Sequence, residues 1–281
     1  MSKLASTARL LAGSTAILAA AGLLAGATAQ TPSLPDFSSH QTSWEQGNGV
    51  NFIPVPGSPP PIANDPTHPH YSNQEARRLG IQPTYRIADL TNPNLKPWAK
   101  RIMKKDNDEV LKGKIAYTPG SSCKPAGVPV FMLDGGPFYF VQAPKEVLII
   151  ASEDSNVRHV YMDVSHSKSP KPSWYGESVG HYENGDTLVV DTIGLTTKTF
   201  VDQFRTPHSD KLHVVERWRL TAGGKTVEIE VTIDDPDTFN QPWKGMVRLQ
   251  RGQLPFTEFV CSEGNHNLFD YGIPVADRPD F

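Results

Sequence analysis

This chain has little cysteine and no excess of positive charge. It contains 281 residues, two cysteines and a formal net charge of −3. A mildly acidic sequence without a basic cluster gives no case for a nucleic-acid partner. No glycine-rich phosphate loop and no dinucleotide fingerprint occurs, so we expect no organic cofactor. These absences exclude several large enzyme classes and leave small-molecule chemistry or binding.

The apolar run near the N-terminus lacks the features of a membrane anchor. Lys3 and Arg9 precede an Ala/Leu-rich stretch at 10–24, and Ala27-Thr28-Ala29 gives a small-x-small cleavage pattern. The stretch is short for a spanning helix, which needs about 20 residues, and no basic stop-transfer flank follows. We therefore expect residues 1–29 to be a signal peptide, and the mature protein to be periplasmic or secreted and not inserted in a membrane. Cleavage removes two positive charges and no negative ones, so the net charge of −3 becomes −5.

The two cysteines, Cys123 and Cys261, flank the part of the chain that is rich in strand patterns. An oxidising compartment permits a disulfide between them. A bond closing so long a loop contributes about 4 kcal/mol in the chain-entropy model. The alternative is two separate buried thiols. No cysteine lies near the cleavage point, which argues against a lipoprotein.

Proline is concentrated after the signal peptide, in residues 30–93. This composition favours polyproline II and turns, so we predict an extended arm that lies on the domain or a loose leader. Helix patterns cover 73–79, which ends at Gly80, and 94–111, which has Pro97 near its first turn. We assign 94–281 to one domain, a helix followed by a β-barrel.

From Val128 onward the hydrophobic pattern has period two, which predicts strands. The expected strands are Phe138–Gln142, Glu146–Glu153, Arg158–Asp163, Ser178–Glu183, Thr187–Ile193, Leu212–Leu220, Thr226–Asp234, Lys244–Gln250 and Glu258–Cys261. Short hairpin signals lie at 184–186 and 222–224. Eight or nine short strands with tight turns indicate a sandwich or a closed barrel, and a meander of about eight encloses one small ligand. We expect a mainly β protein with an antiparallel lipocalin-like (calycin-type) barrel.

Two carboxylates interrupt the apolar faces of these strands. Glu216 shares a face with Val214 and Trp218, and Asp191 shares one with Val189 and Ile193. A barrel interior holding both would raise a carboxyl pKa by desolvation, which prepares a general acid or base. The alternative is that each carboxylate pairs with an arginine, such as Arg158 or Arg217, and closes a polar layer.

The histidines suggest a second acid–base pair. His208 and Asp210 stand in Pro207-His208-Ser209-Asp210, which we place at the barrel mouth. The alternative is a turn in which Asp210 caps backbone amides and His208 faces solvent. His166, His181 and His213 lie close by in sequence. The β-rich region has no His-x-His or His-Glu-x-x-His run, so we expect no metal.

A nucleophile is not expected. Residues 176–180 read Gly-Glu-Ser-Val-Gly, which matches the Gly-x-Ser-x-Gly pattern of a nucleophile elbow. That motif needs a strand–turn–helix context, and here the surroundings are all β. We interpret the match as chance.

Several segments together resemble a large family of exported bacterial proteins, most of them known only as hypothetical proteins. The matching segments are CKPAGVP, WYGESVGHYENGDTLVVDTIG, PHSDKLHVVERWRL, VEIEVTIDDP, QPW and FVCSEGNHN. The resemblance covers about Leu95 to Asn267 and implies a lipocalin-like barrel. Typical members have His-Ser in place of Glu177-Ser178 and Arg-Trp in place of His181-Tyr182. If these positions line the pocket, the ligand or chemistry of this chain differs from theirs.

Two classes of function follow from these patterns. The first is an exported, cofactor-independent lyase or isomerase that acts on a small, partly apolar compound such as an aromatic one. Its expected catalytic residues are His208, Asp210, Glu216 and Asp191, and its expected substrate-binding residues are Tyr175, His181, Trp218 and Glu177. The second is a lipocalin-like protein that binds a small hydrophobic ligand without chemistry. A converging group of histidines and carboxylates favours the enzyme, whereas an apolar lining favours the carrier. A structural envelope protein would have a filled interior. The oligomeric state stays open.

Overall fold

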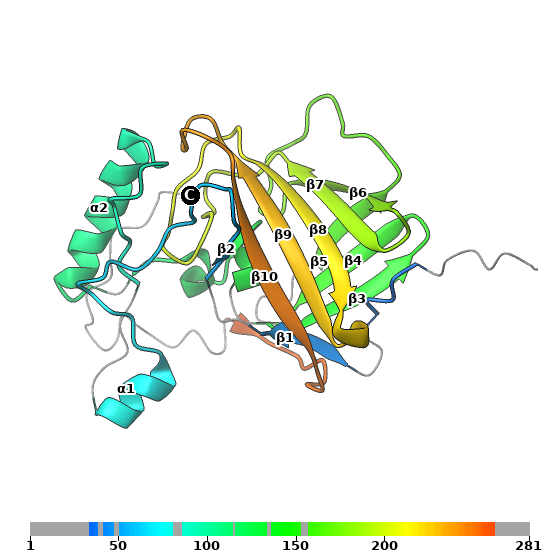
Figure 1. The fold of residues 1–281 in the computed structure, drawn as a ribbon, viewed down its shortest axis with the longest axis horizontal. Coiled ribbons are helices and arrows are strands. Elements are labelled where there is room, and N and C mark those ends of the chain that lie inside the picture. The colour runs from blue at the N-terminus through cyan, green and yellow to red at the C-terminus, as the bar shows by residue number, and fades with distance from the viewer. Residues whose placement is uncertain are drawn as a thin grey trace, which may run out of the picture. The chain divides into compact units, whose positions relative to one another are not determined.

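The sheet of this protein closes on itself through a strand near the N-terminus. The computed structural model describes residues 34–38, 42–47, 51–80, 86–114, 116–133, 136–152 and 157–261 (Figure 1). The strands are β1 (Ser43–Gln46), β2 (Ile53–Pro54), β3 (Phe138–Ala143), β4 (Glu146–Ala151), β5 (Val157–Met162), β6 (Glu177–Glu183), β7 (Thr187–Ile193), β8 (His213–Thr221), β9 (Thr226–Asp234) and β10 (Trp243–Gly252). They run in the order β1-β3-β4-β5-β6-β7-β8-β9-β10-β2, and β1 also pairs with β10. Nine of these described strands therefore form a closed barrel, and β2 is added along β10.

The expectation of a mainly β barrel is confirmed, with one difference in strand direction. The expected meander is antiparallel throughout, but β5 and β6 pair in parallel, with Val160 opposite Ser178 and Met162 opposite Gly180. A parallel pair needs a crossover, because the chain must return to the end at which the first strand began. The connection 163–176 makes this return. It contains His166 and Tyr175.

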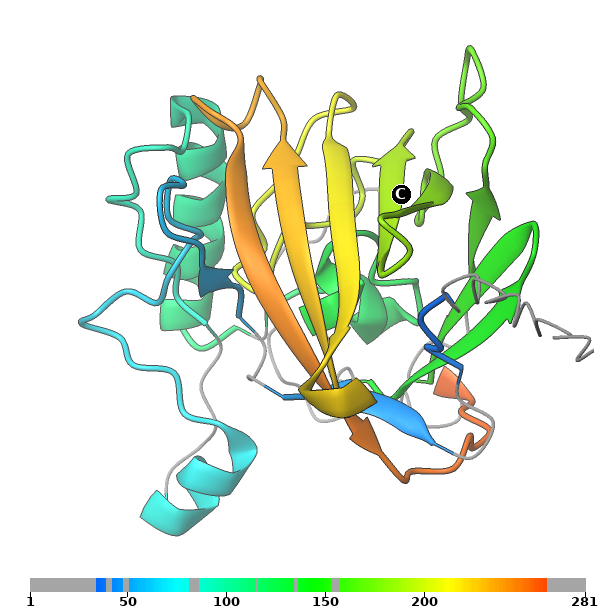
Figure 2. The same cartoon turned by 45° about the vertical axis from the view of Figure 1, so that its right-hand side comes forward.

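The strand that closes the barrel comes from the proline-rich arm. β1 pairs with β10 along its whole length and with β3 at Trp44–Phe138. The Trp44 ring is fully buried and the Arg251 guanidinium lies 4.2 Å from its centroid. The expected last strand at 258–261 is wrong, because residues 253–260 have no strand structure. β1 occupies the edge between β3 and β10 that such a strand would need (Figure 2).

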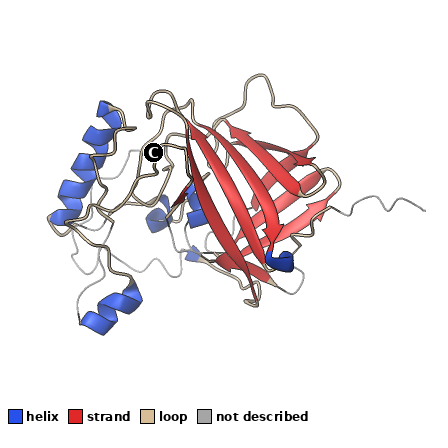
Figure 3. Ribbon diagram, in the orientation of Figure 1, coloured by secondary structure: helices blue, strands red, loops and turns tan. Residues whose placement is uncertain are grey.

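The two α-helices lie outside the barrel, on the side of β2 and β10 (Figure 3). The helices are α1 (Asn73–Leu79), α2 (Pro97–Leu111) and the 3-10 turns η1 (Pro119–Ser122), η2 (Val130–Leu133) and η3 (Ala222–Gly224). Ser72 caps α1, since its side chain accepts a hydrogen bond from the Glu75 amide, and Gly80 ends α1 at φ +68°. α2 packs on the β9–β10 connection, where the Trp98 indole donates to the Asp237 carbonyl. None of the helices in the described part of the chain has the length and apolar character needed to cross a membrane.

The barrel interior is largely filled by side chains of alternate residues. β9 shows the expected pattern, because Val227, Ile229, Val231 and Ile233 are fully buried and the residues between them are partly exposed. η2 covers the barrel end at which β3 and β5 begin. Its Phe131 ring packs edge-on against Phe138 at 5.8 Å. Beneath the Phe131 ring the apolar core is interrupted by a buried ion pair between Arg158 and Glu216.

Candidate histidine–carboxylate site

Four ionisable side chains form a continuous chain of contacts on the outer face of β6, β7 and β8. We call Glu177, His166, Asp191 and His213 the outer cluster. His166 Nδ1 lies 3.0 Å from Glu177 Oε1, and His166 Nε2 lies 3.0 Å from Asp191 Oδ1. His213 Nε2 lies 2.8 Å from the same Asp191 oxygen. Acid and imidazole therefore alternate along the cluster, with Asp191 shared by two rings.

Strand register places three of these residues side by side. Asp191 in β7 pairs with Val179 in β6 and with Val215 in β8. Glu177 and His213 each stand two residues before those partners, so both are diagonal neighbours of Asp191 on one face. Gly176 allows the chain to enter β6 here: its φ is +65°, and a Cβ at this position would lie 2.5 Å from the Ile193 carbonyl oxygen.

The fourth member, His166, comes from the β5–β6 connection. Its side chain is 21% exposed, against 36% for Asp191 and 40% for His213. The Ser167 amide donates to Glu177 Oε1 at 2.7 Å and anchors the same connection to the start of β6. Both ring nitrogens of His166 face carboxylate oxygens, so this imidazole bridges Glu177 and Asp191.

These contacts shift the pKa values of the cluster. Burial alone would raise the pKa of Asp191, but the hydrogen bonds from His213 and His166 outweigh it and leave that pKa below its usual value. The hydrogen bond to Asp191 raises the pKa of His213. The Ser167 backbone hydrogen bond lowers the pKa of Glu177. His213 Nδ1 makes no hydrogen bond to any described residue. The cluster thus contains an oriented imidazole with one nitrogen available for proton transfer.

Glu216 lies on the other face of the sheet, inside the barrel. Its carboxylate is fully buried and pairs with Arg158 Nη1 at 2.8 Å. The Arg158 Nε and Nη2 atoms donate to Ser178 and Thr192, at 3.1 and 2.8 Å. The Trp218 indole donates to Glu216 Oε2 at 3.4 Å. Both charges are therefore paired and hydrogen-bonded, as buried charges must be.

The interior pair has little freedom to act as a catalyst. Burial raises the pKa of the Glu216 carboxyl, and the Arg158 charge opposes that rise. The Phe131 ring lies 5.2 Å from the Arg158 guanidinium and covers it. The structure thus gives Glu216 the arginine partner that the polar-layer alternative describes.

The expectation that Asp191 and Glu216 share the barrel interior is wrong. Glu216 pairs in register with Val190, whereas Asp191 pairs with Val215, so the two carboxylates point to opposite faces. The sequence around Asp191 is apolar on both faces of β7, and a period-two pattern cannot choose between them.

His208 and Asp210 do not form a pair. The His208 ring is buried, with Nδ1 2.8 Å from the Ser209 carbonyl and Nε2 2.7 Å from the Thr199 hydroxyl. Burial lowers the pKa of His208, which favours a neutral ring. Asp210 is exposed and its side chain makes no hydrogen bond to a described residue. The buried carboxylate nearby is Asp235, which accepts from the Ser209 amide and hydroxyl.

The expected substrate-binding residues are dispersed. Tyr175 packs edge-on against Phe131, with ring centroids 6.0 Å apart. Trp218 is buried in the core and stacks edge-on against Phe140 at 5.3 Å. His181 is exposed on the outer face of β6, with Nε2 3.5 Å from Glu183. Glu177 alone of these four belongs to the outer cluster.

Sequence reasoning did not assign a role to several residues that the structure brings together. Ser178 and Thr192 complete the buried network, and Thr199 and Asp235 hold the segment around His208. The inward alternation of β6 and β7 was a usable signal for Ser178 and Thr192. No local pattern marks Thr199, whose hydroxyl contacts His208. Thr199 also packs closely against Gly127, where a Cβ would lie 2.2 Å from Thr199 Cγ2.

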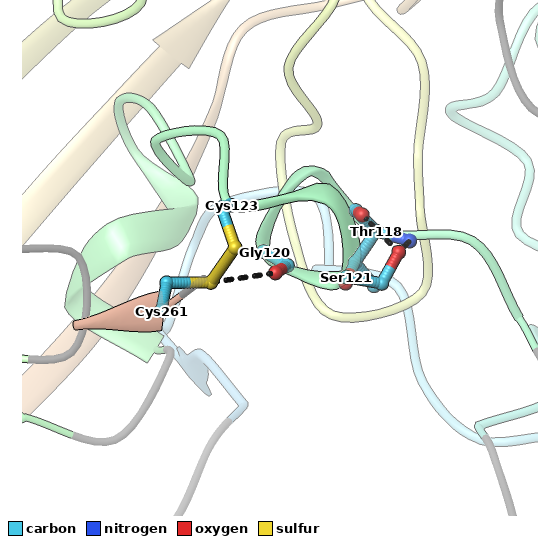
Figure 4. Close-up of a disulfide and its surroundings, with 5 residues drawn as sticks. All are labelled: Thr118, Gly120, Ser121, Cys123 and Cys261. Carbon is cyan, nitrogen blue, oxygen red and sulfur yellow. Dashed lines mark hydrogen bonds between the residues drawn. A yellow bond between two sulfur atoms is a disulfide. The ribbon is translucent and has the colours of Figure 1, made fainter. Parts of the chain in front are cut away.

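A pocket of about 390 Å³ lies beside the disulfide, away from the residues of the outer cluster. The expected bond joins Cys123 and Cys261, and Figure 4 shows the Cys261 sulfur beside the Gly120 carbonyl. Phe131, Phe138 and Phe259 supply the aromatic part of the lining. This pocket contains none of the residues that the sequence predicts for the site.

No group of three or more histidine, cysteine or carboxylate side chains in the described ranges has the arrangement of a metal site.

No protein-family model, curated protein or solved structure matches this chain. The fold and the outer cluster therefore define it as a mixed β-barrel protein with a surface histidine–carboxylate chain.

Proposed function

We propose that this protein is an exported, cofactor-independent acid–base enzyme of the lyase or isomerase type, with its reaction centre at the outer cluster. The main observation in support of this proposal is that Asp191 Oδ1 contacts both His166 and His213. A carboxylate on Nε2 orients an imidazole and stabilises its protonated form, so that the other nitrogen can accept a proton from substrate. His213 has that nitrogen available.

The roles divide along the cluster. His213 Nδ1 takes a proton from the substrate, and the imidazolium so formed is stabilised by Asp191. The same proton then returns to a different substrate atom in an isomerisation, or to the leaving group in an elimination. Glu177 and His166 fix the position of Asp191 from the other side. No electron acceptor or metal enters this sequence of steps.

The surface around the cluster suits a partly apolar substrate. Val179 and Val215, the two partners of Asp191, are partly exposed on the same face. An apolar group of the substrate can pack on these valines while its polar group lies at His213. The other expected residues fit the reaction less well, because His208 and Glu216 are buried and already hydrogen-bonded.

The test is a turnover screen on a small-metabolite mixture, read by liquid chromatography and mass spectrometry. An elimination changes the mass of the substrate, and an isomerisation changes only its retention time. The wild-type protein should convert at least one compound, and His213→Gln should slow that conversion by about 10²- to 10⁴-fold. Asp191→Asn should slow it as well, because the imidazolium loses its partner.

His159→Gln is the matched control. His159 also pairs with a carboxylate, Glu146, on the outer surface of the barrel, but it belongs to no larger cluster. Conversion should be unchanged in this variant. Conversion that survives His213→Gln but is lost in a folded His208→Gln variant would move the reaction centre to the buried histidine and end this proposal.

A further inference from the structure

The pocket beside the disulfide has the composition of a small-molecule site. Its volume is about 390 Å³, and Phe131, Phe138 and Phe259 line it together with Ala126 and Ala151. Ligand sites are typically clefts of roughly 300–1,000 Å³ with mostly apolar and aromatic walls and few polar groups. Three phenylalanine rings around one space favour a planar, aromatic occupant, because aromatic pairs gain energy beyond the area that they bury.

One wall of this pocket is held rigidly from behind. The Phe131 ring has the Arg158 guanidinium 5.2 Å from its centroid, and the Phe138 and Tyr175 rings contact it edge-on. Phe131 and Phe138 are both almost fully buried. A ligand therefore contacts only the small part of each ring that reaches the pocket, and it meets rings that are already ordered, which lowers the entropic cost of binding.

Lys124 is the charged residue of the pocket lining. This side chain is exposed, and it makes no hydrogen bond or ion pair with any described residue. Its neighbour in the chain, Cys123, also lines the pocket. An ammonium group at the rim of an aromatic pocket is complementary to a ligand that carries an acidic group on a ring system.

The opposite wall is Phe259, on a segment without strand structure. Residues 253–260 are attached upstream by the Tyr139 hydroxyl, which donates to the Leu254 carbonyl, and by the Phe256 ring at 5.1 Å from Tyr139. Downstream, Cys261 is bonded to Cys123. The disulfide is therefore the covalent connection that keeps Phe259 over the pocket.

We propose that this pocket is a binding site for a planar aromatic acid, whose rings lie among Phe131, Phe138 and Phe259 and whose acidic group pairs with Lys124. The Cys123–Cys261 disulfide holds the Phe259 wall closed on the ligand. The pocket shares no residue with the outer cluster, so ligand binding in the pocket can be tested independently of the reaction proposed at the cluster.

The test is isothermal titration calorimetry of the oxidised protein with 2-naphthoate and with its neutral analogue 2-naphthamide. The naphthoate should bind more tightly than the amide. Lys124→Gln should weaken naphthoate binding about threefold to fivefold, as expected for an exposed ion pair, and leave the amide unaffected. Phe259→Ala should weaken both probes by about tenfold. Reduction of the disulfide should have the same effect as Phe259→Ala.

Two matched variants separate the pocket from its surroundings. Tyr161→Ala removes an exposed aromatic ring from β5 that does not line the pocket, and Lys145→Gln removes an exposed lysine from the β3–β4 turn. Both should bind the probes as the wild type does. Absence of saturable binding by the folded, oxidised protein at millimolar naphthoate would overturn the proposal. So would equal losses in Tyr161→Ala and Phe259→Ala.

Discussion

The buried pair Arg158–Glu216 and the outer cluster contain similar groups but lie on opposite faces of the same strands. Glu216 in β8 points inward and is fully buried, whereas His213 in the same strand points outward and is 40% exposed. Inside, one arginine satisfies the carboxylate and two hydroxyl groups satisfy the arginine. Outside, the shared carboxylate of Asp191 leaves one imidazole nitrogen of His213 available. Exposure and the partner therefore decide whether a carboxylate in this barrel belongs to a buried ion pair or orients an imidazole at the surface.

The two histidines of the Pro207–His213 segment repeat this contrast. Burial lowers the pKa of His208, and the hydrogen bond to Asp191 raises the pKa of His213. Protonation therefore destabilises the folded state at His208 and stabilises it at His213.

Removal of the buried carboxylate should have the largest effect. Glu216→Ala leaves the Arg158 charge buried without a partner, which is expected to lower the free energy of unfolding by about 3–5 kcal/mol. Asp191→Ala on the outer face should lower it by at most about 1 kcal/mol. Urea denaturation of the purified variants measures both values. The double variant Arg158→Met/Glu216→Leu should recover most of the loss, because it buries no charge. Equal losses in Glu216→Ala and Asp191→Ala would contradict the comparison.

Removal of the buried histidine should have an intermediate effect. His208→Ala leaves the Ser209 carbonyl and the Thr199 hydroxyl without their partner, at a cost of about 1–3 kcal/mol in unfolding free energy. Because burial lowers the pKa of His208, its contribution is complete above the unfolded value of 6.5 and is lost as the pH falls toward the folded pKa. The difference between wild type and variant should therefore shrink in acid. A constant difference across this range would mean that His208 is not desolvated.

On the outer face, the effect of Asp191 on His213 should be visible mainly as a pKa change. Asp191→Asn should lower the pKa of His213 toward 6.5, measured by NMR titration of the imidazole protons. Since the folded pKa is raised, the linked stability is complete below 6.5 and is lost as the pH rises through the folded pKa. Solvent screening keeps this contribution under about 1 kcal/mol. Glu146→Gln, remote from the cluster, should leave the His213 pKa unchanged.

The isolated outer pair should show the smallest effect. His159→Gln removes the partner of Glu146, and both side chains are substantially exposed. Its unfolding free energy should stay within about 0.5 kcal/mol of the wild type. A loss as large as that of Asp191→Ala would mean that the outer cluster gains nothing from its shared carboxylate.

Much of the barrel could be predicted from local pattern. The limits of β7 and β9, the hairpins at 184–186 and 222–224, and the inward face of Glu216 all follow from period-two alternation and turn residues. β1 could not be predicted this way. Ser43–Gln46 is a short segment in a proline-rich region, and it becomes a strand because β3 and β10 both offer it an edge.

The site was less predictable than the fold. Glu177 and Asp191 were recognised as candidates, but His166 lies in a connection without periodicity. The contact between His166 and Asp191 depends on the parallel β5–β6 pair, because the connection that holds His166 must return to the start of β6, next to β7. When a strand is apolar on both faces, as around Asp191, the sequence pattern does not indicate which face lies inside the barrel.

Local sequence pattern is sufficient to predict a mainly β chain, its hairpins and the residue types available for acid–base chemistry. The tertiary structure decided which of those residues meet. Arg158 and Glu216 are 58 positions apart and His166 and Asp191 are 25 apart, so their contacts depend on strand register and on closure of the barrel. Local propensity acts over a few residues, whereas register is set by packing across the whole sheet. For that reason one carboxylate became half of a buried ion pair and the other became the centre of an exposed histidine cluster.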